Sequence, residues 1–235
     1  MKKRPPSILF ACLLLLCALT GCSDASDSGT LQRGQPIADY ETARQLFWKE
    51  LYADGGTTLY CRQLFGACYN RGINIEHVFP ASWIAYDLRC GKRYQCRNSS
   101  PRFNRIEADL HNLYPSRSEI NKARSNYRYA DTPGERREFG LCDFEIDERQ
   151  RLAEPAPAAR GRIARAMLYM ADEYDLYLKS RQRALLQDWD RQYPPNESER
   201  RRNDRIEQIQ GNRNRFIDAH RQGATQAAKR LPEQD

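Results

Sequence analysis

The stretch NIEHVFP at residues 74–80 decides the fold, because it places a glutamate and a histidine side by side at the end of an expected strand. Aromatic and β-branched runs between residues 57 and 80 predict a hairpin with Ile73, Ile75 and His77 on one face. Neighbouring side chains of an extended strand point to opposite faces. The glutamate and the histidine are therefore expected to share one pocket only if the backbone departs from extended geometry.

Helical periodicity dominates the rest of the chain. A first amphipathic helix is predicted over residues 40–51. Ser116 and Glu119 form a capping-box pattern, which predicts a short helix over residues 117–125. Polar, basic residues 90–101 are predicted to form a loop. The last predicted helices cover residues 157–178, 181–192 and 197–210. These patterns predict an α+β domain that is mostly helical.

The N-terminal residues have the pattern of an export signal. Three cations at positions 2–4 precede the apolar run 8–19, which is shorter than a membrane span. LTGC at 19–22 resembles a bacterial lipobox, in which Cys22 becomes the acylated first residue. Serine after that cysteine favours the outer membrane. The predicted organisation is a lipoprotein signal peptide at 1–21, a lipidated flexible tether at 22–38, a folded domain at 39–220 and a flexible tail at 221–235.

Five of the eight cysteines remain once the signal is removed and Cys22 is lipidated. In an oxidising compartment, the close spacings Cys61/Cys68 and Cys90/Cys96 suit two local disulfides. Cys142 is then either unpaired or bonded to Cys61 or Cys68. A zinc site has little support because no Cys-x2-Cys pair is present.

The chain is basic, and its charge is unevenly distributed. Its formal charge is +7, which falls to +4 when the signal is removed. Between Cys61 and Glu107, eight Arg or Lys residues oppose three acidic ones. A mean hydropathy of −0.84 excludes a multi-span membrane protein. The basic segment surrounds His77, where a polyanion would be expected to bind.

Histidine chemistry has few candidates, because the chain contains only His77, His111 and His220. The metalloprotease motif His-Glu-x-x-His is absent, and its inverted form fails because position 73 is Ile73. There is no Gly-x-Ser-x-Gly elbow and no P-loop, so serine hydrolases and P-loop NTPases lose their usual sequence support. His111 is interpreted as a structural residue or as one that supports the residues of the site, and His220 as a surface residue.

Four separated blocks occur in an order that is similar to a known family. They are IEHVFPA at 75–81, RIEADLHNLYPS at 105–116, EIN at 119–121 and QGNRN at 210–214. Together they resemble the endonuclease I family of bacterial periplasmic or secreted, non-specific DNA and RNA endonucleases. The resemblance implies a single domain around a small antiparallel ββα-metal, or His-Me finger, core.

The resemblance also implies roles for particular residues. His77 is expected to be the general base that activates water, and Glu76 and Asn121 the ligands of one divalent metal. The expected ion is Mg²⁺, with Mn²⁺ or Ca²⁺ as substitutes. Arg93 is expected to stabilise the cleaved phosphate, and Glu107 to support the active site. The other candidates for the phosphate contact are Arg89, Lys92 and Arg97. The expected substrate-binding residues are Lys92, Arg97, Arg105 and Arg124.

The sequence thus predicts a lipid-anchored, Mg²⁺-dependent, sequence-nonspecific endonuclease that acts on DNA, with RNA as a further candidate substrate. Non-specificity is expected because no recognised base-reading module is present. We expect a monomer that contacts the membrane only through Cys22 and faces the periplasm or the exterior. The alternative is a non-catalytic basic envelope lipoprotein that binds polyanions. A third possibility is a zinc enzyme using His77 and His111.

Overall fold

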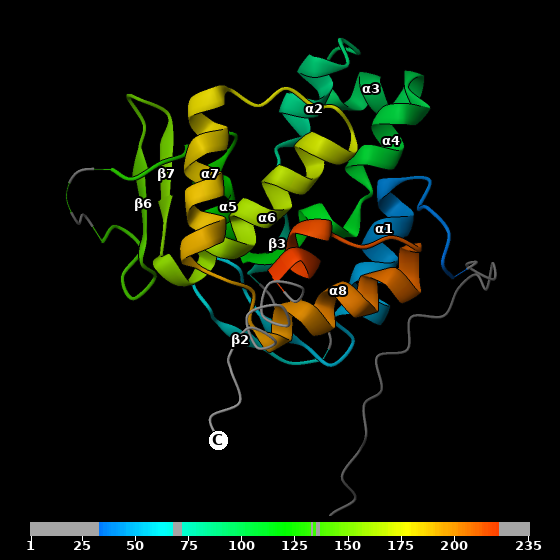
Figure 1. Cartoon of the computed structure of the whole chain (residues 1–235). Coiled ribbons are helices and arrows are strands. Elements are labelled where there is room, and N and C mark those ends of the chain that lie inside the picture. Colours follow the sequence, from blue (N-terminus) through cyan, green and yellow to red (C-terminus); the bar gives the residue numbers. More distant parts are fainter. Residues whose placement is uncertain (1–32, 68–71, 133, 135–136, 221–235) are drawn as a thin grey trace, which may run out of the picture. The chain divides into compact units, whose positions relative to one another are not determined.

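The computed structural model describes residues 33–67, 72–132, 134 and 137–220 (Figure 1). The expected signal peptide, the lipidation site Cys22, the disulfide candidate Cys68 and the tail at 221–235 lie outside the described residues. Among those that are described, no helix is both long and apolar enough to cross a bilayer.

The strand that carries Glu76 and His77 pairs with a distant segment. Strand β3 (Ile73–His77) is antiparallel to β4 (Leu113–Arg117), with His77 opposite Leu113. The predicted hairpin within residues 57–80 is therefore wrong in its pairing. Only β1 (Gly56–Thr57) and β2 (Leu64–Phe65) form a short ladder there. Helix α5 (Ser118–Arg124) follows β4 directly, so two antiparallel strands and a helix surround the histidine.

Helices make up most of the remaining structure, which confirms the α+β class. The N-terminal helices are α1 (Tyr40–Leu46), the π-helix η1 (Phe47–Leu51), α2 (Ala81–Asp87), α3 (Arg93–Ser99), α4 (Pro101–Glu107) and the short 3-10 helix η2 (Leu110–Asn112). The C-terminal helices are α6 (Pro157–Glu173), α7 (Ser180–Gln192) and α8 (Glu197–Gln210). A small sheet, in the order β5-β7-β6, consists of β5 (Arg128–Tyr129), β7 (Leu152–Pro155) and β6 (Phe144–Asp147). Figure 1 shows α6 and α7 beside this sheet.

Three local predictions are wrong, each for a physical reason. The expected loop at 90–101 is helical, because Gln95 caps the backbone N–H of Lys92 and Pro101 begins α4. Ser116 does not cap α5, because it pairs with Asn74 across the β3–β4 ladder. Helix α6 ends at Glu173 rather than near residue 178, and Asp175 just beyond it has φ of 52°.

The β3–β4 pair lies between two hydrophobic clusters. Tyr114 of β4 belongs to the larger cluster, which contains buried residues of α6 and α7, including Met167 and Trp189. Its neighbour Leu113 belongs to the smaller cluster, formed with residues of η1 and α8 such as Phe47. Because successive strand residues point to opposite faces, this alternation embeds the strand pair between the two cores.

Two disulfides are present among the described residues. Cys90 bonds to Cys96, as the spacing predicted. Cys61 bonds to Cys142 rather than to Cys68, so the long-range alternative for Cys142 is the one observed. The first bridge links α3 to the segment before it, whereas the second spans 81 residues of sequence.

Loss of the Cys61–Cys142 bridge should cost more stability than loss of the local bridge. Its loop of 81 residues restricts the unfolded chain more than the loop of 6 residues between Cys90 and Cys96. By the loop-entropy relation we expect losses of about 4.5 and about 2 kcal/mol, respectively. Urea denaturation of the two double alanine variants measures the difference. Equal losses would contradict the assignment of stability to loop length.

Candidate active site

A cleft of about 620 Å³ lies beside β3, at the edge to which no other described strand is paired. Four consecutive residues, 74–77, line it, and so do Tyr40, Arg93, Asn121 and other residues of α2 and α5. Glu76 and His77 therefore border one cleft although the strand stays extended through His77. The expectation that this needs a break in the strand is wrong, because both residues lie within β3 and both line the cleft.

Glu76 is buried, with 2% of its surface exposed, and two side chains hold one of its carboxylate oxygens. Its Oε1 accepts hydrogen bonds from the Tyr60 hydroxyl at 2.7 Å and from Nη1 of Arg124 at 3.0 Å. Burial raises the pKa of Glu76 above its ordinary value, while Arg124 and Tyr60 act in the opposite direction. Both side-chain partners contact the same oxygen of a carboxylate that borders the cleft.

Arg124, expected to bind substrate, is fully buried at the end of α5. Besides Glu76, its guanidinium donates to the carbonyl oxygens of His77 at 2.9 Å and Val78 at 2.6 Å. It also lies 4.5 Å over the ring of Tyr129. The substrate-binding expectation for Arg124 is therefore wrong, because its side chain is fully buried and both Nη1 and Nη2 donate to groups inside the protein. Arg124 instead positions Glu76 and the end of β3.

His77 is fixed on both sides of its ring. Its Nε2 lies 3.1 Å from the carbonyl oxygen of Glu107, and the Tyr40 ring packs at 5.1 Å between centroids. A carbonyl only accepts hydrogen bonds, so we assign the ring proton to Nε2 and the lone pair to Nδ1. Burial, followed by the charge of Arg93, lowers the pKa of His77 to about 3. The ring is therefore neutral at physiological pH, with a lone pair for accepting a proton.

Asn121 of α5 lies against the free edge of β3. Its Nδ2 donates to the carbonyl oxygen of Ile75 at 3.1 Å and to Oδ1 of Asn74 at 2.8 Å. These two bonds orient the amide, so the Oδ1 end of Asn121 remains for another partner in the cleft. Asn74 is a positioning residue that the sequence analysis missed, although it stands two residues before Glu76.

The donors around the cleft fit a hard divalent cation. Glu76 supplies a carboxylate and Asn121 an amide oxygen, the kinds of ligand that Mg²⁺ accepts. Within the described part of the chain, no group of three or more His, Cys, Asp or Glu side chains is placed to hold a metal. Two protein ligands would leave most positions of the ion to water and phosphate.

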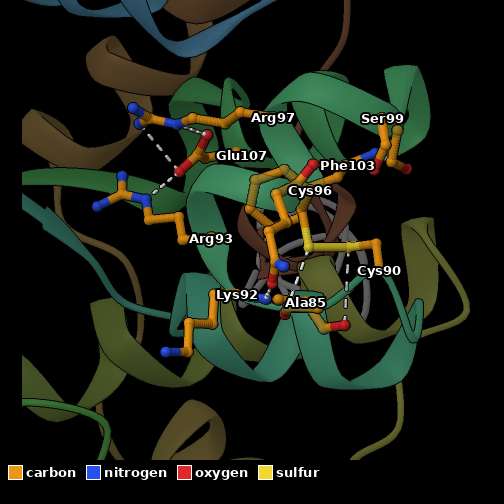
Figure 2. Close-up of a disulfide and its surroundings, with 12 residues drawn as sticks. Ala85, Cys90, Lys92, Arg93, Cys96, Arg97, Ser99, Phe103 and Glu107 are labelled. Carbon is orange, nitrogen blue, oxygen red and sulfur yellow. Dashed lines mark hydrogen bonds and ion pairs between the residues drawn. A yellow bond between two sulfur atoms is a disulfide. The ribbon is translucent and has the colours of Figure 1, made fainter.

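Glu107 joins two arginines of α3, Arg93 and Arg97 (Figure 2). Its fully buried carboxylate accepts a hydrogen bond from Nε of Arg93 and one from Nε of Arg97 at 2.7 Å. The two guanidinium carbons lie 5.2 and 4.9 Å from the centre of the Tyr40 ring. Because its carbonyl oxygen also contacts His77, Glu107 links the arginines to the imidazole.

Of the four basic residues considered for the phosphate contact, Arg93 lines the cleft. Arg97 makes two contacts to Glu107 and is less exposed than Arg93. Lys92 extends away from Glu107 in Figure 2, and Arg89 is exposed in the turn after α2. The structure therefore places Arg93, and none of its three alternatives, in the lining of the cleft that His77 also lines.

Arg105 is not brought to the cleft. It borders a different cavity of about 240 Å³, with Asp109 and Tyr174. His111 is also away from the cleft lining, buried with its Nε2 3.3 Å from the carbonyl oxygen of Asn212. His220 contacts Asp190 at 2.9 Å.

Tyr40 and Tyr60 are further residues of the site that the sequence analysis missed. Tyr40 comes from the first turn of α1 and Tyr60 from the segment after β1, both outside the four sequence blocks. Neither has a local signal, because a tyrosine at the start of a helix or after a strand is unremarkable. Only the packing of α1 against α4 and the Tyr60–Glu76 hydrogen bond reveal their positions.

The fold and the cleft define an α+β protein in which an imidazole, a carboxylate, an amide and a guanidinium meet at the edge of a short antiparallel strand pair. The sequence model of the Endonuclease I family matches residues 22–221, so the chain belongs to that family.

The chain is similar to several characterised bacterial proteins. It is 44% identical over 155 residues to a periplasmic deoxyribonuclease of Aeromonas hydrophila, covering 63% of this chain and 65% of the relative. An extracellular deoxyribonuclease of the same organism is 43% identical over 150 residues, covering 62% and 65%. Endonuclease-1 of Buchnera aphidicola subsp. Acyrthosiphon pisum (strain APS) is 35% identical over 182 residues, covering 75% and 72%. The chain thus matches slightly less than two thirds of each Aeromonas relative.

Proposed function

We propose that this chain is an endonuclease that uses a divalent metal ion, with Mg²⁺ as the proposed ion, to hydrolyse phosphodiester bonds in DNA without sequence preference. The observation that carries the proposal is the shared cleft lined by His77, Glu76, Asn121 and Arg93. Relatives named deoxyribonuclease support DNA as the substrate. RNA is a second candidate substrate.

The proposed base is Nδ1 of His77. Its lone pair accepts a proton from the attacking water, while the bond from Nε2–H to Glu107 holds the ring and the Tyr40 ring packs beside it. Burial lowers the pKa of His77, which keeps the ring neutral but weakens it as a base, whereas the hydrogen bond to the Glu107 carbonyl raises the pKa and opposes this effect. Glu107 has a positioning role, because its carboxylate is occupied by arginines and only its backbone oxygen reaches the imidazole.

We assign stabilisation of the negative charge on the reacting phosphate to Arg93 and the metal ion. The guanidinium of Arg93 would donate to phosphate oxygens in the cleft, because its contact with Glu107 uses Nε alone. A divalent ion held by Glu76 and Asn121 would supply Lewis-acid stabilisation of the charge on the phosphate. Arg124, Tyr60 and Asn74 position these ligands before any ion or substrate binds.

Plasmid cleavage tests this proposal directly. The purified full chain should convert supercoiled plasmid to nicked and linear forms with Mg²⁺, and chelation by EDTA should abolish the conversion. Removal of zinc by a selective chelator should leave Mg²⁺-supported cleavage unchanged, which separates this proposal from the zinc alternative. A plasmid that stays intact in the presence of Mg²⁺ and also in the presence of Mn²⁺ would contradict the endonuclease proposal. It would favour the alternative of a non-catalytic lipoprotein that binds polyanions.

Arg93 and Arg97 provide a matched pair, because each contributes an ion pair to Glu107. We expect Arg93→Ala to lower kcat about 10²-fold, as for loss of one donor to the developing charge. Arg97→Ala should change kcat less than about threefold, because Arg97 does not line the cleft. Steady-state kinetics on a defined oligonucleotide would compare them. Equal losses would instead assign the effect to the shared contact with Glu107.

Export and anchoring are also proposed. The basic and apolar pattern of residues 1–21 and the lipobox at Cys22 support export as a lipoprotein of the outer membrane. Relatives named as periplasmic or extracellular are consistent with an exported enzyme. Mass spectrometry of the protein from membranes would detect the acyl chains on Cys22, and an unmodified N-terminus would contradict the anchor.

A further inference from the structure

A second cavity of about 270 Å³ lies beside the cleft that contains His77. It is close to the lower size of small-ligand sites, which begin at about 300 Å³. Three aromatic side chains line it: Trp83 and Tyr86 from α2, and Tyr177 from the segment between α6 and α7. Tyr86 is 85% exposed and Tyr177 68% exposed, so their rings are available to a ligand.

The second cavity and the cleft adjoin. Asn126 lines both of them. Its Nδ2 donates to Oγ of Ser82 at 3.2 Å, and Ser82 lines the cleft while the next residue, Trp83, lines the second cavity. A polymer whose phosphate lies beside His77 therefore reaches the second cavity by crossing the Ser82–Asn126 contact.

Cations surround the aromatic side chains. Arg128, Arg151 and Lys179 all line the second cavity and are exposed. None of the three forms an ion pair with another described residue, whereas arginines elsewhere, such as Arg160 and Arg165, do. The carboxylate of Asp87 accepts a hydrogen bond from the backbone N–H of Tyr177. Arg151 contacts neutral groups, Oδ1 of Asn126 at 2.5 Å and the Tyr127 ring at 4.8 Å, so three cations outweigh the one carboxylate of Asp87 and the net charge at this cavity is positive.

Resting on the endonuclease function proposed above, we propose that this cavity is a nucleotide subsite that receives an unpaired base next to the scissile phosphate. The base stacks on Trp83, Tyr86 or Tyr177, since stacking on aromatic rings suits any of the four bases. The adjoining phosphates contact the cations, as expected for an anionic backbone. Aromatic faces beside cations that form no ion pair with another described residue match the two halves of a nucleotide, and Asn126 joins this cavity to the cleft.

The subsite has a consequence for substrate choice. A base inside a duplex is paired and stacked, and it must be unstacked before it can enter a pocket. The cavity therefore strengthens binding of single-stranded DNA more than binding of duplex DNA. The cleft alone, which acts on phosphate, makes no such distinction.

The test compares three tyrosine variants of the full chain. Tyr86→Ala and Tyr177→Ala remove stacking surface, whereas Tyr94→Ala is the control, because Tyr94 is 62% exposed on α3 and borders neither cavity. Cleavage kinetics use a single-stranded oligonucleotide and the matching duplex. Fluorescence anisotropy with labelled single strand in EDTA measures binding without cleavage.

We expect each cavity variant to raise KM and the dissociation constant for the single strand about tenfold, the effect of losing one stacking contact. For the duplex, KM of each cavity variant should stay within twofold of that of the unmodified protein. For Tyr94→Ala, KM and the dissociation constant should stay within twofold as well. Two results would contradict the subsite, provided that the unmodified protein cleaves DNA. In the first, the cavity variants bind the single strand with unchanged affinity. In the second, they lose affinity for single strand and duplex equally. If no protein cleaves, the endonuclease proposal fails, and anisotropy still decides whether the cavity binds a single strand.

Discussion

His77→Ala is expected to lower kcat for plasmid cleavage by about 10³-fold, the usual effect of removing a general base. Among the residues that line the cleft, His77 is the only histidine, and its ring is oriented by the carbonyl oxygen of Glu107. Alanine removes the acceptor for the proton of water but leaves Glu76 and Asn121 in place. KM should therefore change little, and the measurement is steady-state cleavage with saturating Mg²⁺.

His220→Ala is the matched control for this experiment. His220 contacts Asp190 and lies outside the cleft lining, so its removal should leave kcat within twofold. Far-UV circular dichroism and thermal unfolding would show whether His77→Ala retains the fold. A folded His77→Ala protein that cuts as fast as the unmodified enzyme would overturn the proposed base.

Arg124→Met is expected to destabilise the protein by about 3 to 5 kcal/mol, the cost of leaving one partner of a buried ion pair alone. Glu76 and Arg124 are both almost completely buried, and Arg124 also donates to two carbonyl oxygens at the end of β3. Without this guanidinium, burial would raise the pKa of Glu76 further, because Arg124 now opposes that rise. Urea denaturation at neutral pH measures the loss.

A second readout separates positioning of Glu76 from a purely structural role for Arg124. Because Nη1 of Arg124 holds Oε1 of Glu76 at 3.0 Å, Arg124→Met should release this carboxylate and need a higher Mg²⁺ concentration for half-maximal cleavage, and Arg124→Lys should recover part of this loss. Arg181→Met is the control, since Arg181 is exposed on α7 and should lose less than about 0.5 kcal/mol. An unchanged Mg²⁺ requirement in folded Arg124→Met would contradict the positioning role.

Short-range signals in the sequence predicted several elements correctly. Helix α8 begins after Asn196, whose side chain caps the backbone N–H of Glu199, and ends at Gly211 with φ of 86°. The helical period likewise identified α1, α6 and α7. These signals succeed because capping and periodicity depend on residues within one or two turns.

The candidate site was harder to predict, because its supporting residues come from distant segments. Arg124 appears in the sequence as one more basic residue near the site, and only its burial between Glu76 and Tyr129 shows that it faces inward. The sequence likewise does not distinguish Arg93 from Arg97, because they are four residues apart in one basic segment. Their different places relative to the cleft depend on how α3 and α4 pack around Glu107.

By itself, the sequence determined the chemical groups at the candidate site, the family resemblance carried by its four blocks, and the helices with local start and stop signals. Only the tertiary structure decided that β3 pairs with β4, that Cys61 bonds to Cys142, and that Arg124 lies buried against Glu76. The physical reason is distance along the chain. Caps and periodicity act between near neighbours, whereas strand pairing, disulfide partners and buried ion pairs are selected by the packing of the whole domain.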